Sequence, residues 1–244
     1  MNKLRHLDEF KKILADYSMS PESKQILRET NLVLLVAPTS AGRNTIIREL
    51  IKTGDYHFIV SDTTRRPRTN DGVAEKNGVE YWFKSEEDVL LDLKAGKYLE
   101  AAVIHSQQVS GISMRELSRA SRENKIAITD IEVEGVKHIM SIPSNTYPIF
   151  VLPPSFEEWQ HRLRHRGEMS SEEVRRRLQS ACDELSEAIK QPYYTFVIND
   201  TVEEAISQIH QLAKMGVTDP ATQKSGRNLA EQLYIQTKAY LDFQ

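Results

Sequence analysis

Residues 31–45 read NLVLLVAPTSAGRNT, and this stretch decides how the chain folds. Residues 31–37 are almost entirely apolar, which is typical of a strand buried on both faces of a parallel sheet. Residues 38–45 form a short loop that contains Gly42, and the segment that follows, IIRELIKTG, has the composition of a helix. A buried strand that passes through a short loop into a helix begins an α/β fold, in which ligands bind at the carboxyl ends of the strands.

The same alternation continues along the chain. Further strands are expected at residues 57–61, 98–105, 125–130, 147–152 and 195–198. Helices between them are expected to begin at a Ser or Thr that is followed three residues later by an acid, the N-capping pattern. This pattern occurs at Ser85, Ser113, Ser155, Ser170 and Thr201. The chain is therefore predicted to form an α/β fold with a mainly parallel sheet core.

The two ends of the chain are predicted to be helical. Residues 1–30 form an N-terminal helical extension, because apolar residues recur at helical spacing and Ser20-Pro21 restarts a helix. Residues 214–226 contain Gly, Pro, Ser and Thr and indicate a linker, which is followed by a C-terminal helix over 227–244. We expect these helices to pack on the core or on a second subunit, so a homodimer through them is possible.

Composition excludes some classes of protein. The 244 residues include 32 Lys and Arg and 35 Asp and Glu, so the net charge of −3 argues against a dedicated nucleic-acid coat. The single cysteine, Cys182, excludes an intramolecular disulfide and favours a reducing compartment. No apolar stretch approaches the roughly 20 residues that a membrane-spanning helix needs. We expect a cytoplasmic protein with no nucleic-acid or membrane partner.

The loop after the first strand has the position and length of a phosphate-binding P-loop. That motif reads G-x-x-x-x-G-K-[S/T], and its backbone N–H groups converge on phosphate oxygens. Here only Gly42 is kept, because Ala37, Arg43 and Asn44 replace the first Gly, the Lys and the hydroxyl residue. An ordinary strand–turn–helix explains this stretch equally well. As a degenerate P-loop, it would bind ATP phosphates through Thr39, Ser40, Ala41, Gly42, Arg43, Asn44 and Thr45.

A second phosphate-binding candidate follows the second strand. Arg65 and Arg68 flank Pro67, and the two side chains can point the same way and hold one phosphate by forked hydrogen bonds. The alternative is a solvated basic turn.

These segments resemble guanylate kinases. S-x-T-T-R-x-P-R at 61–68 and E-x-N-G-x-x-Y-x-F at 75–83 are similar to the GMP-binding signature of that family. Further ordered matches occur at residues 98–100, 128–135, 153–155, 162–167, 175–178 and 198–200, so the resemblance covers residues 31–213. It implies a P-loop nucleoside monophosphate kinase fold with a small GMP-binding lobe near 61–110 and an arginine-rich lid near 162–177. It implies the transfer of a phosphoryl group from ATP to GMP with Mg²⁺.

The resemblance also implies roles for individual residues. The GMP-binding residues would be Ser61, Arg65, Arg68, Tyr81, Glu100 and Glu132. The arginines that neutralise charge on the transferring phosphoryl group would be Arg43, Arg162, Arg166 and Arg177. Asp130 and Asn44 would hold the metal, and Asn199 would lie on the adenine side.

This sequence departs from the family pattern at the base as well as at the P-loop. The family's Y-G-[ST]-S segment is replaced by residues 109–113, VSGIS, where Ser110 and Ile112 stand, so guanine specificity is open. Arg at the P-loop Lys position also occurs in guanylate-kinase-like domains of scaffold proteins, which bind phosphorylated peptides. A catalytically inactive module that binds GMP or a phosphorylated protein is therefore the alternative to a kinase of weakened activity. The six arginines between 162 and 177 favour the kinase, because a lid has little use without a nucleotide donor.

Overall fold

The computed structural model describes residues 3–70, 72–165 and 169–243. The chain forms two compact units. The first unit comprises Met1–Asn31, His57–Ala127 and His138–Asn145, and the second comprises Leu32–Tyr56, Ile128–Lys137 and Thr146–Gln244. The N-terminal extension therefore belongs to one unit with residues of the predicted GMP-binding lobe, which the sequence did not indicate.

The main sheet begins with the strand predicted from residues 31–37. Among the described residues it has five strands in the order β11-β10-β1-β9-β2. These are β1 (Leu32–Val36), β2 (Tyr56–Phe58), β9 (Ile126–Asp130), β10 (Thr146–Leu152) and β11 (Thr195–Ile198). Strand β10 runs parallel to β1 and to β11, with Ile149 opposite both Leu35 and Thr195. All five residues of β1 are buried, which confirms the prediction of a strand covered on both faces.

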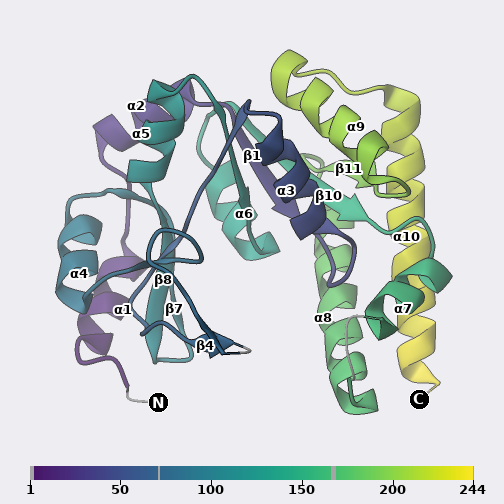
Figure 1. Ribbon diagram of the computed structural model, residues 1–244, viewed down its shortest axis with the longest axis horizontal. Helices are drawn as coiled ribbons and strands as arrows, with labels where there is room; N and C mark the ends of the chain where they lie inside the picture. Colours follow the sequence, from purple (N-terminus) through teal and green to yellow (C-terminus); the bar gives the residue numbers. More distant parts are fainter. Residues whose placement is uncertain (1–2, 71, 166–168, 244) are drawn as a thin grey trace. The chain divides into compact units, whose positions relative to one another are not determined.

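Helices of the second unit follow the strands (Figure 1). They are α3 (Arg43–Lys52), α7 (Phe156–Arg164), α8 (Ser171–Lys190), α9 (Val202–Met215) and α10 (Pro220–Asp242), and α6 (Val133–Met140) crosses the boundary between the units. Helix α10 packs against α8 and β11, and α3 packs against α9. The predicted C-terminal helix thus contributes to the core of the second unit.

The predicted linker at 214–226 is wrong over most of its length. Helix α9 continues to Met215, and α10 already begins at Pro220, with the Asp219 side chain accepting a hydrogen bond from the amide of Thr222. Proline at the first helical position and an acidic N-cap start a helix, so the composition was misread. Gly226 lies inside α10, and this position needs a glycine because a Cβ there would come within 2.7 Å of Phe196 Cβ on β11. The glycine marks close packing of helix and strand rather than a flexible link.

The described residues of the first unit form a mixed sheet, with two antiparallel strand pairs and one parallel pair, that the strand–helix alternation did not indicate. Four strands lie in the order β6-β3-β8-β7, namely β3 (Asp62–Thr63), β6 (Trp82–Phe83), β7 (Tyr98–Ile104) and β8 (Gln108–Ser113). A separate hairpin pairs β4 (Thr69–Asn70) with β5 (Val73–Ala74). The helices are α1 (Leu7–Ala15), α2 (Pro21–Glu29), α4 (Glu86–Lys94) and α5 (Met114–Arg122).

The N-terminal extension is part of the hydrophobic core of the first unit. Leu4, Leu7 and Phe10 are buried in one cluster with residues of α4, β7 and β8, including Tyr98 and Val109. The hydroxyl of Tyr17 donates to the carbonyl of Tyr98 and accepts from its amide, both at 2.7 Å. The extension therefore packs on the core of the first unit, one of the two arrangements expected, while a dimer formed through the terminal helices stays a prediction.

The predicted helix starts are confirmed. Each side chain predicted as an N-cap accepts a hydrogen bond from a backbone amide of the first turn, at Ser85, Ser113, Ser155, Ser170 and Thr201. Each of these caps stabilises its helix by roughly 1 kcal/mol. Within the described residues, no helix is both long and apolar enough to span a membrane.

Candidate functional site

The loop that joins β1 to α3 has a backbone that only certain residues can adopt. Ser40 and Gly42 have φ angles of 65° and 97°, both in the left-handed region. Gly42 is also the N-cap of α3, and a Cβ on it would lie 2.1 Å from Asn199 Nδ2. The loop therefore needs glycine for both its conformation and its packing. A glycine that starts a helix after a strand is the setting in which backbone amides bind phosphate.

Side chains of the second unit hold this loop in place. The indole Nε1 of Trp159 donates to the carbonyl of Thr39 at 2.7 Å, and Asn199 Nδ2 donates to the carbonyl of Ala41 at 2.7 Å. Arg162 Nη1 donates in turn to the carbonyl of Asn199 at 3.1 Å. Asn199 thus supports the loop backbone, and its predicted place on the adenine side stays a prediction.

The loop and two of the predicted lid arginines line one cavity of about 940 Å³ in the second unit. Arg162 comes from α7, Arg177 from α8, and Arg177 Nη1 donates to the hydroxyl of Thr39 at 3.3 Å. The cavity is lined by residues 37–45 together with Arg48, Glu132, Glu158, His161, Arg162, His165, Arg177 and Glu184. Arginines projecting into one cavity beside a helix N-terminus suit a ligand with several phosphates. Arg166 lies outside the described residues.

Ion pairs set the direction of these arginines. Arg162 Nε lies 2.8 Å from Glu158 Oε1, and Arg177 Nε lies 2.7 Å from Glu173 Oε1. Hydrogen bonds from the arginines lower the pKa of both glutamates, so the carboxylates stay charged at neutral pH. In each guanidinium Nε binds its glutamate, while Nη1 of Arg177 reaches Thr39 of the loop and Nη1 of Arg162 reaches the carbonyl of Asn199.

Arg43 and Asp130 meet beside the loop. Arg43 Nη2 lies 2.9 Å from Asp130 Oδ2, at the carboxyl end of β9. Both side chains are partly exposed. The structure thus places the predicted metal carboxylate next to the arginine that replaces the P-loop lysine. Mg²⁺ in phosphate-binding sites is held by one or two carboxylates together with substrate phosphates. The Asp130 carboxylate can therefore bind Mg²⁺ only if Arg43 leaves one of its oxygens available to the metal.

Glu184 is a residue of this cavity that was not predicted. It lies seven residues after Arg177 on α8, so the two side chains lie on the same face of the helix. Burial raises the pKa of the Glu184 carboxyl to about 7, although the nearby Arg43 opposes this shift. The spacing of seven residues between Arg177 and Glu184 on one helix could have indicated that Glu184 lies near the site. Near neutral pH the Glu184 carboxyl is therefore partly protonated beside the loop arginine.

In the first unit, Arg65 is held by an acid and two rings. Its two terminal nitrogens donate to the two carboxylate oxygens of Glu75, at 2.6 and 2.8 Å. The guanidinium carbon lies 4.7 Å from the ring centre of Tyr81 and 5.6 Å from that of Phe83. The hydrogen bonds from Arg65 and from the amide of Arg68 lower the pKa of Glu75 to about 2. No role was predicted for Glu75. In the structure it fixes both the Arg65 guanidinium and the turn at Arg68.

Glu100 shares one face of the four-stranded sheet with Ser110 and Ile112. The β7–β8 register pairs Glu100 with Ile112 and Ala102 with Ser110, and Thr63 of β3 lies opposite Ser110. Because side chains alternate along a strand, Glu100, Ser110 and Ile112 lie on the same face. Ile112 is buried, and the Ser110 hydroxyl donates to Thr63 Oγ1 at 2.9 Å. Ser61 immediately precedes β3, whereas Glu132 belongs to the second unit and lines the P-loop cavity.

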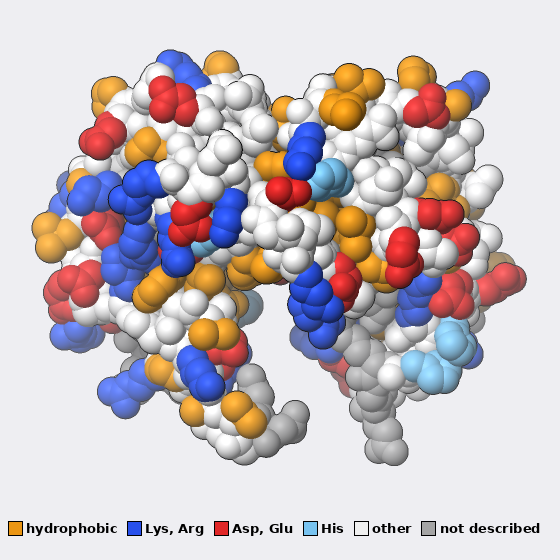
Figure 2. All heavy atoms as spheres, turned by 45° about the horizontal axis from the view of Figure 1, so that its top comes forward, with side chains coloured by type: hydrophobic (Ala, Val, Ile, Leu, Met, Phe, Trp, Pro, Cys, Tyr) orange, Lys and Arg blue, Asp and Glu red, His pale blue; other side chains and the backbone are white. Residues whose placement is uncertain are grey.

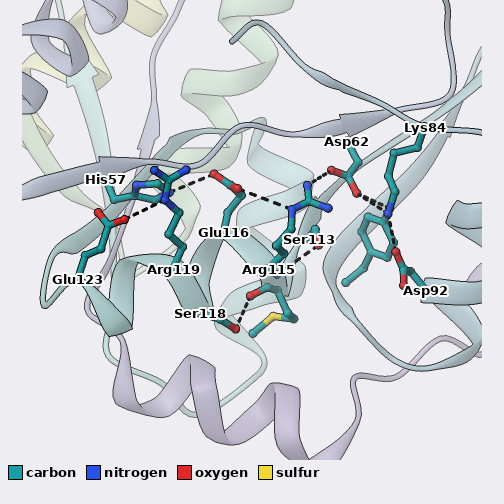
Figure 3. Close-up of polar contacts among 12 residues, drawn as sticks. His57, Asp62, Lys84, Asp92, Ser113, Arg115, Glu116, Ser118, Arg119 and Glu123 are labelled. Carbon is teal, nitrogen blue, oxygen red and sulfur yellow. Dashed lines mark hydrogen bonds and ion pairs between the residues drawn. The ribbon is translucent and has the colours of Figure 1, made fainter. Parts of the chain in front are cut away.

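A buried charge network supports the strand that carries this face (Figure 3). Asp62 is 1% exposed and accepts hydrogen bonds from the Tyr98 hydroxyl and from Arg115 Nη2, both at 2.7 Å. Lys84 Nζ lies 3.6 Å from Asp62 and 2.6 Å from Asp92. The network was not predicted, because its members are distant in the sequence. It holds β3 rigidly next to the turn of Arg65 and Arg68.

Trp159→Phe is expected to lower the free energy of unfolding by roughly 1–3 kcal/mol, because it leaves the carbonyl of Thr39 without its indole donor. Trp82→Phe is the matched control, since Trp82 Nε1 is buried with no hydrogen-bond partner among the described residues. Urea denaturation measures both variants. Equal losses of stability in the two variants would contradict the role given to the Trp159 hydrogen bond.

Comparison with known proteins gives consistent matches. The family model for guanylate kinase matches residues 29–215. The guanylate kinase of Rickettsia prowazekii is 31% identical over 182 residues, which span 74% of this chain and 89% of that protein. That of Methylobacillus flagellatus is 33% identical over 186 residues, spanning 75% and 88%. The crystal structure of guanylate kinase from Anaplasma phagocytophilum has a TM-score of 0.54 at 23% identity, covering 85% of this chain and 97% of that one.

Proposed function

Since this chain belongs to the guanylate kinase family and has a P-loop nucleoside monophosphate kinase fold, we propose that it converts ATP and GMP to ADP and GDP. A guanylate kinase-like phosphotransferase is the activity that its relatives support. One observation carries the proposal for this chain. The loop after β1 and the arginines of α7 and α8 line a single cavity, as phosphoryl transfer from a triphosphate requires.

The second unit is proposed to bind ATP. Backbone amides of residues 39–45 at the start of α3 would bind the phosphates, with the Arg43 guanidinium beside them. Arg162 and Arg177 would neutralise the charge of the transferring phosphoryl group, together with Arg166. Phosphoryl transfer depends mainly on positioning and electrostatic stabilisation, so these groups suffice without a covalent intermediate.

The first unit is proposed to bind the phosphate of GMP. Arg65 would present its guanidinium in the orientation set by Glu75 and Tyr81, with Arg68 and Ser61 completing the phosphate contacts. Glu100 would accept hydrogen bonds from the guanine edge, and the GMP-binding role of Glu132 stays a prediction. Ile112 offers no hydrogen bond to the base, so we propose that discrimination for guanine is relaxed.

A divalent metal, Mg²⁺, is proposed to accompany ATP. Asp130 would hold it, directly or through water, with the amide oxygen of Asn44 as a neutral second ligand. Bound there, the metal would neutralise charge on the β- and γ-phosphates. Arg43 pairs with Asp130 at 2.9 Å, so the arginine and the metal compete for one carboxylate. We propose that this competition weakens the activity.

The same ion pair favours one alternative function. If Arg43 keeps Asp130, the second unit lacks its metal carboxylate, and the chain would be a catalytically inactive module that binds GMP or a phosphorylated protein through Arg65 and Arg68. Calorimetry separates the two functions. The kinase requires saturable binding of both ATP with Mg²⁺ and GMP, whereas binding of GMP without ATP would favour the inactive module.

Arg43→Lys combined with Asn44→Ser is expected to raise kcat by at least about tenfold. A compact ammonium suits the phosphate loop better than a planar guanidinium, and the serine restores a hydroxyl ligand for the metal. A coupled assay of ADP formation with GMP as acceptor measures the gain. An unchanged or lower kcat, with both nucleotides still bound, would show that the loop is not what limits the rate.

A further inference from the structure

A second cavity, of about 720 Å³, lies in the first unit. Its walls come from the N-terminal segment, the turn after β3, the start of α4 and the β7–β8 turn. The lining residues are Lys3, Leu4, Arg5, Thr64, Arg65, Arg66, Pro67, Arg68, Lys84, Ser85, Glu86, Gln107 and Gln108. Residues 3–5 lie before the segment that matches the guanylate kinase family, so this wall lies outside the matched segment.

This cavity lies on the α1 side of the four-stranded sheet. Thr64, one of its lining residues, pairs with Val109 through two hydrogen bonds of 2.9 Å. Val109 is buried in the cluster that contains Leu4 and Leu7 of the extension. Because side chains alternate, Thr64 and Val109 face away from Glu100 and Ser110. The cavity therefore lies behind the turn of Arg65 and Arg68, opposite the face proposed for the base of GMP.

Charge in this cavity is strongly positive. Six of its lining residues are Lys or Arg, and Glu86 is its one acid. Three of the cations have carboxylate partners: Arg5 with Glu86 and Glu87, Arg65 with Glu75, and Lys84 with Asp92. Among the described residues, the side chains of Lys3, Arg66 and Arg68 form no ion pair with a carboxylate. Figure 2 shows Lys and Arg side chains gathered on this unit, on the left of the view.

The N-terminal wall of the cavity is fixed by the fold. Leu4 is buried, and its amide donates to the carbonyl of Ser106 at 3.2 Å. The amides of Arg5 and His6 donate to the two carboxylate oxygens of Glu86, at 3.3 and 3.0 Å. These contacts place the cationic side chains of residues 3 and 5 at the cavity although they precede α1. An ordered backbone lowers the entropy that ligand binding has to overcome.

We propose that this cavity binds an oligophosphate, a chain of three or more phosphates, through Lys3 and Arg66, next to the two arginines that it shares with the proposed phosphate site of GMP. Its volume is that of a small-molecule site rather than of a flat macromolecular interface. Guanidinium groups bind phosphate oxygens through forked hydrogen bonds, and Lys3 adds a point charge at the rim. The hydroxyl and amide groups of Thr64, Ser85, Gln107 and Gln108 add polar lining. The ligand is either free oligophosphate or the phosphate chain of a nucleotide.

Calorimetric titration with inorganic tripolyphosphate tests the proposal. The titration uses the full chain carrying Arg43→Ala, which removes an arginine from the P-loop cavity and so weakens binding there. Adding Lys3→Ala and Arg66→Ala is expected to lower the affinity for tripolyphosphate at least about tenfold, because two phosphate-binding cations are lost. Neither residue is proposed to bind GMP or ATP. Both side chains are exposed, so the melting temperature is expected to stay unchanged.

Lys11→Ala with Arg122→Ala is the matched control. It removes the same charge from exposed positions of the same unit that do not line the cavity, on α1 and α5. The control is expected to change the affinity less than about twofold. Equal losses in the two double variants, or no binding of tripolyphosphate by the parent, would each overturn the proposal.

Repeating the titration with GTP identifies the source of the phosphates. Tighter binding of GTP than of tripolyphosphate, lost in the Lys3→Ala and Arg66→Ala variant, supports a nucleotide as the ligand. Tighter binding of tripolyphosphate, lost in the same variant, supports free oligophosphate.

Discussion

Arg65→Ala is expected to lower kcat/KM for GMP by about 100- to 1000-fold, the range found when one preorganised charge contact to a reacting group is removed. In the first unit, the orientation of the Arg65 guanidinium is fixed by an acid and two aromatic rings. Glu75 holds both of its terminal nitrogens, and the rings of Tyr81 and Phe83 lie against the guanidinium. Steady-state rates at varied GMP and saturating ATP measure the effect.

Arg65→Lys is the informative companion variant. It keeps the positive charge but loses the planar fork, so we expect it to recover only a small part of the lost activity. Circular dichroism verifies that both variants fold, because removing the Arg65 guanidinium leaves Glu75 with the amide of Arg68 but without its charged partner. An unchanged KM and kcat for GMP in folded Arg65→Ala protein would exclude Arg65 from the GMP site.

Asp62→Ala is expected to lower the free energy of unfolding by about 3–5 kcal/mol. Asp62 is almost fully buried, and it accepts from Tyr98 and Arg115 while Lys84 lies nearby (Figure 3). Without it, the buried Tyr98 hydroxyl loses its acceptor, Arg115 loses a partner at 2.7 Å, and Lys84 keeps Asp92 alone of its two carboxylates. Urea denaturation measures the loss.

Glu123→Ala is the matched control for Asp62→Ala. Glu123 pairs with Arg119 and Lys125 in the same unit, but these pairs are solvent-exposed, so the change is expected to stay within about 0.5 kcal/mol. Tyr98→Phe removes one hydrogen bond and is expected to cost about 1 kcal/mol. A loss for Asp62→Ala no larger than that for Glu123→Ala would contradict a supporting role of the network.

Local features of the fold could be predicted from the sequence because short-range physics determines them. Strand β1 follows from an apolar run, and the capping side chains follow from Ser or Thr placed before an acidic first turn. The P-loop position follows from a strand, a glycine and a helix in succession. The wrong prediction of a linker at 214–226 also concerns short-range signals. Asp219 and Pro220 are an N-cap and a first helical residue, which start α10, but the same residue types are also common in linkers.

Features that depend on distant residues could not be predicted. Asp62 meets Tyr98 and Arg115 across 36 and 53 residues, and Asn199 reaches the P-loop across 158. No periodicity reports such contacts, because they arise only when strands and helices pack. The basic cavity behind the turn has the same origin, since residues 3–5 and 64–68 come together through the docking of α1. The Arg65–Glu75 pair could be predicted only in part. The motif identified Arg65 as a phosphate-binding candidate, but it did not indicate that Glu75 would hold the guanidinium.

We propose above all that this chain transfers a phosphoryl group from ATP to GMP despite Arg43 and Asn44 in its P-loop. Chromatographic quantification of nucleotides after incubation of the purified chain with ATP, Mg²⁺ and GMP tests it most directly. We predict that ADP and GDP form in equal amounts, and that Arg65→Ala removes nearly all of both. Saturable binding of GMP with no GDP formed, in the wild-type chain and in the variant with the Arg43→Lys and Asn44→Ser substitutions alike, would contradict it.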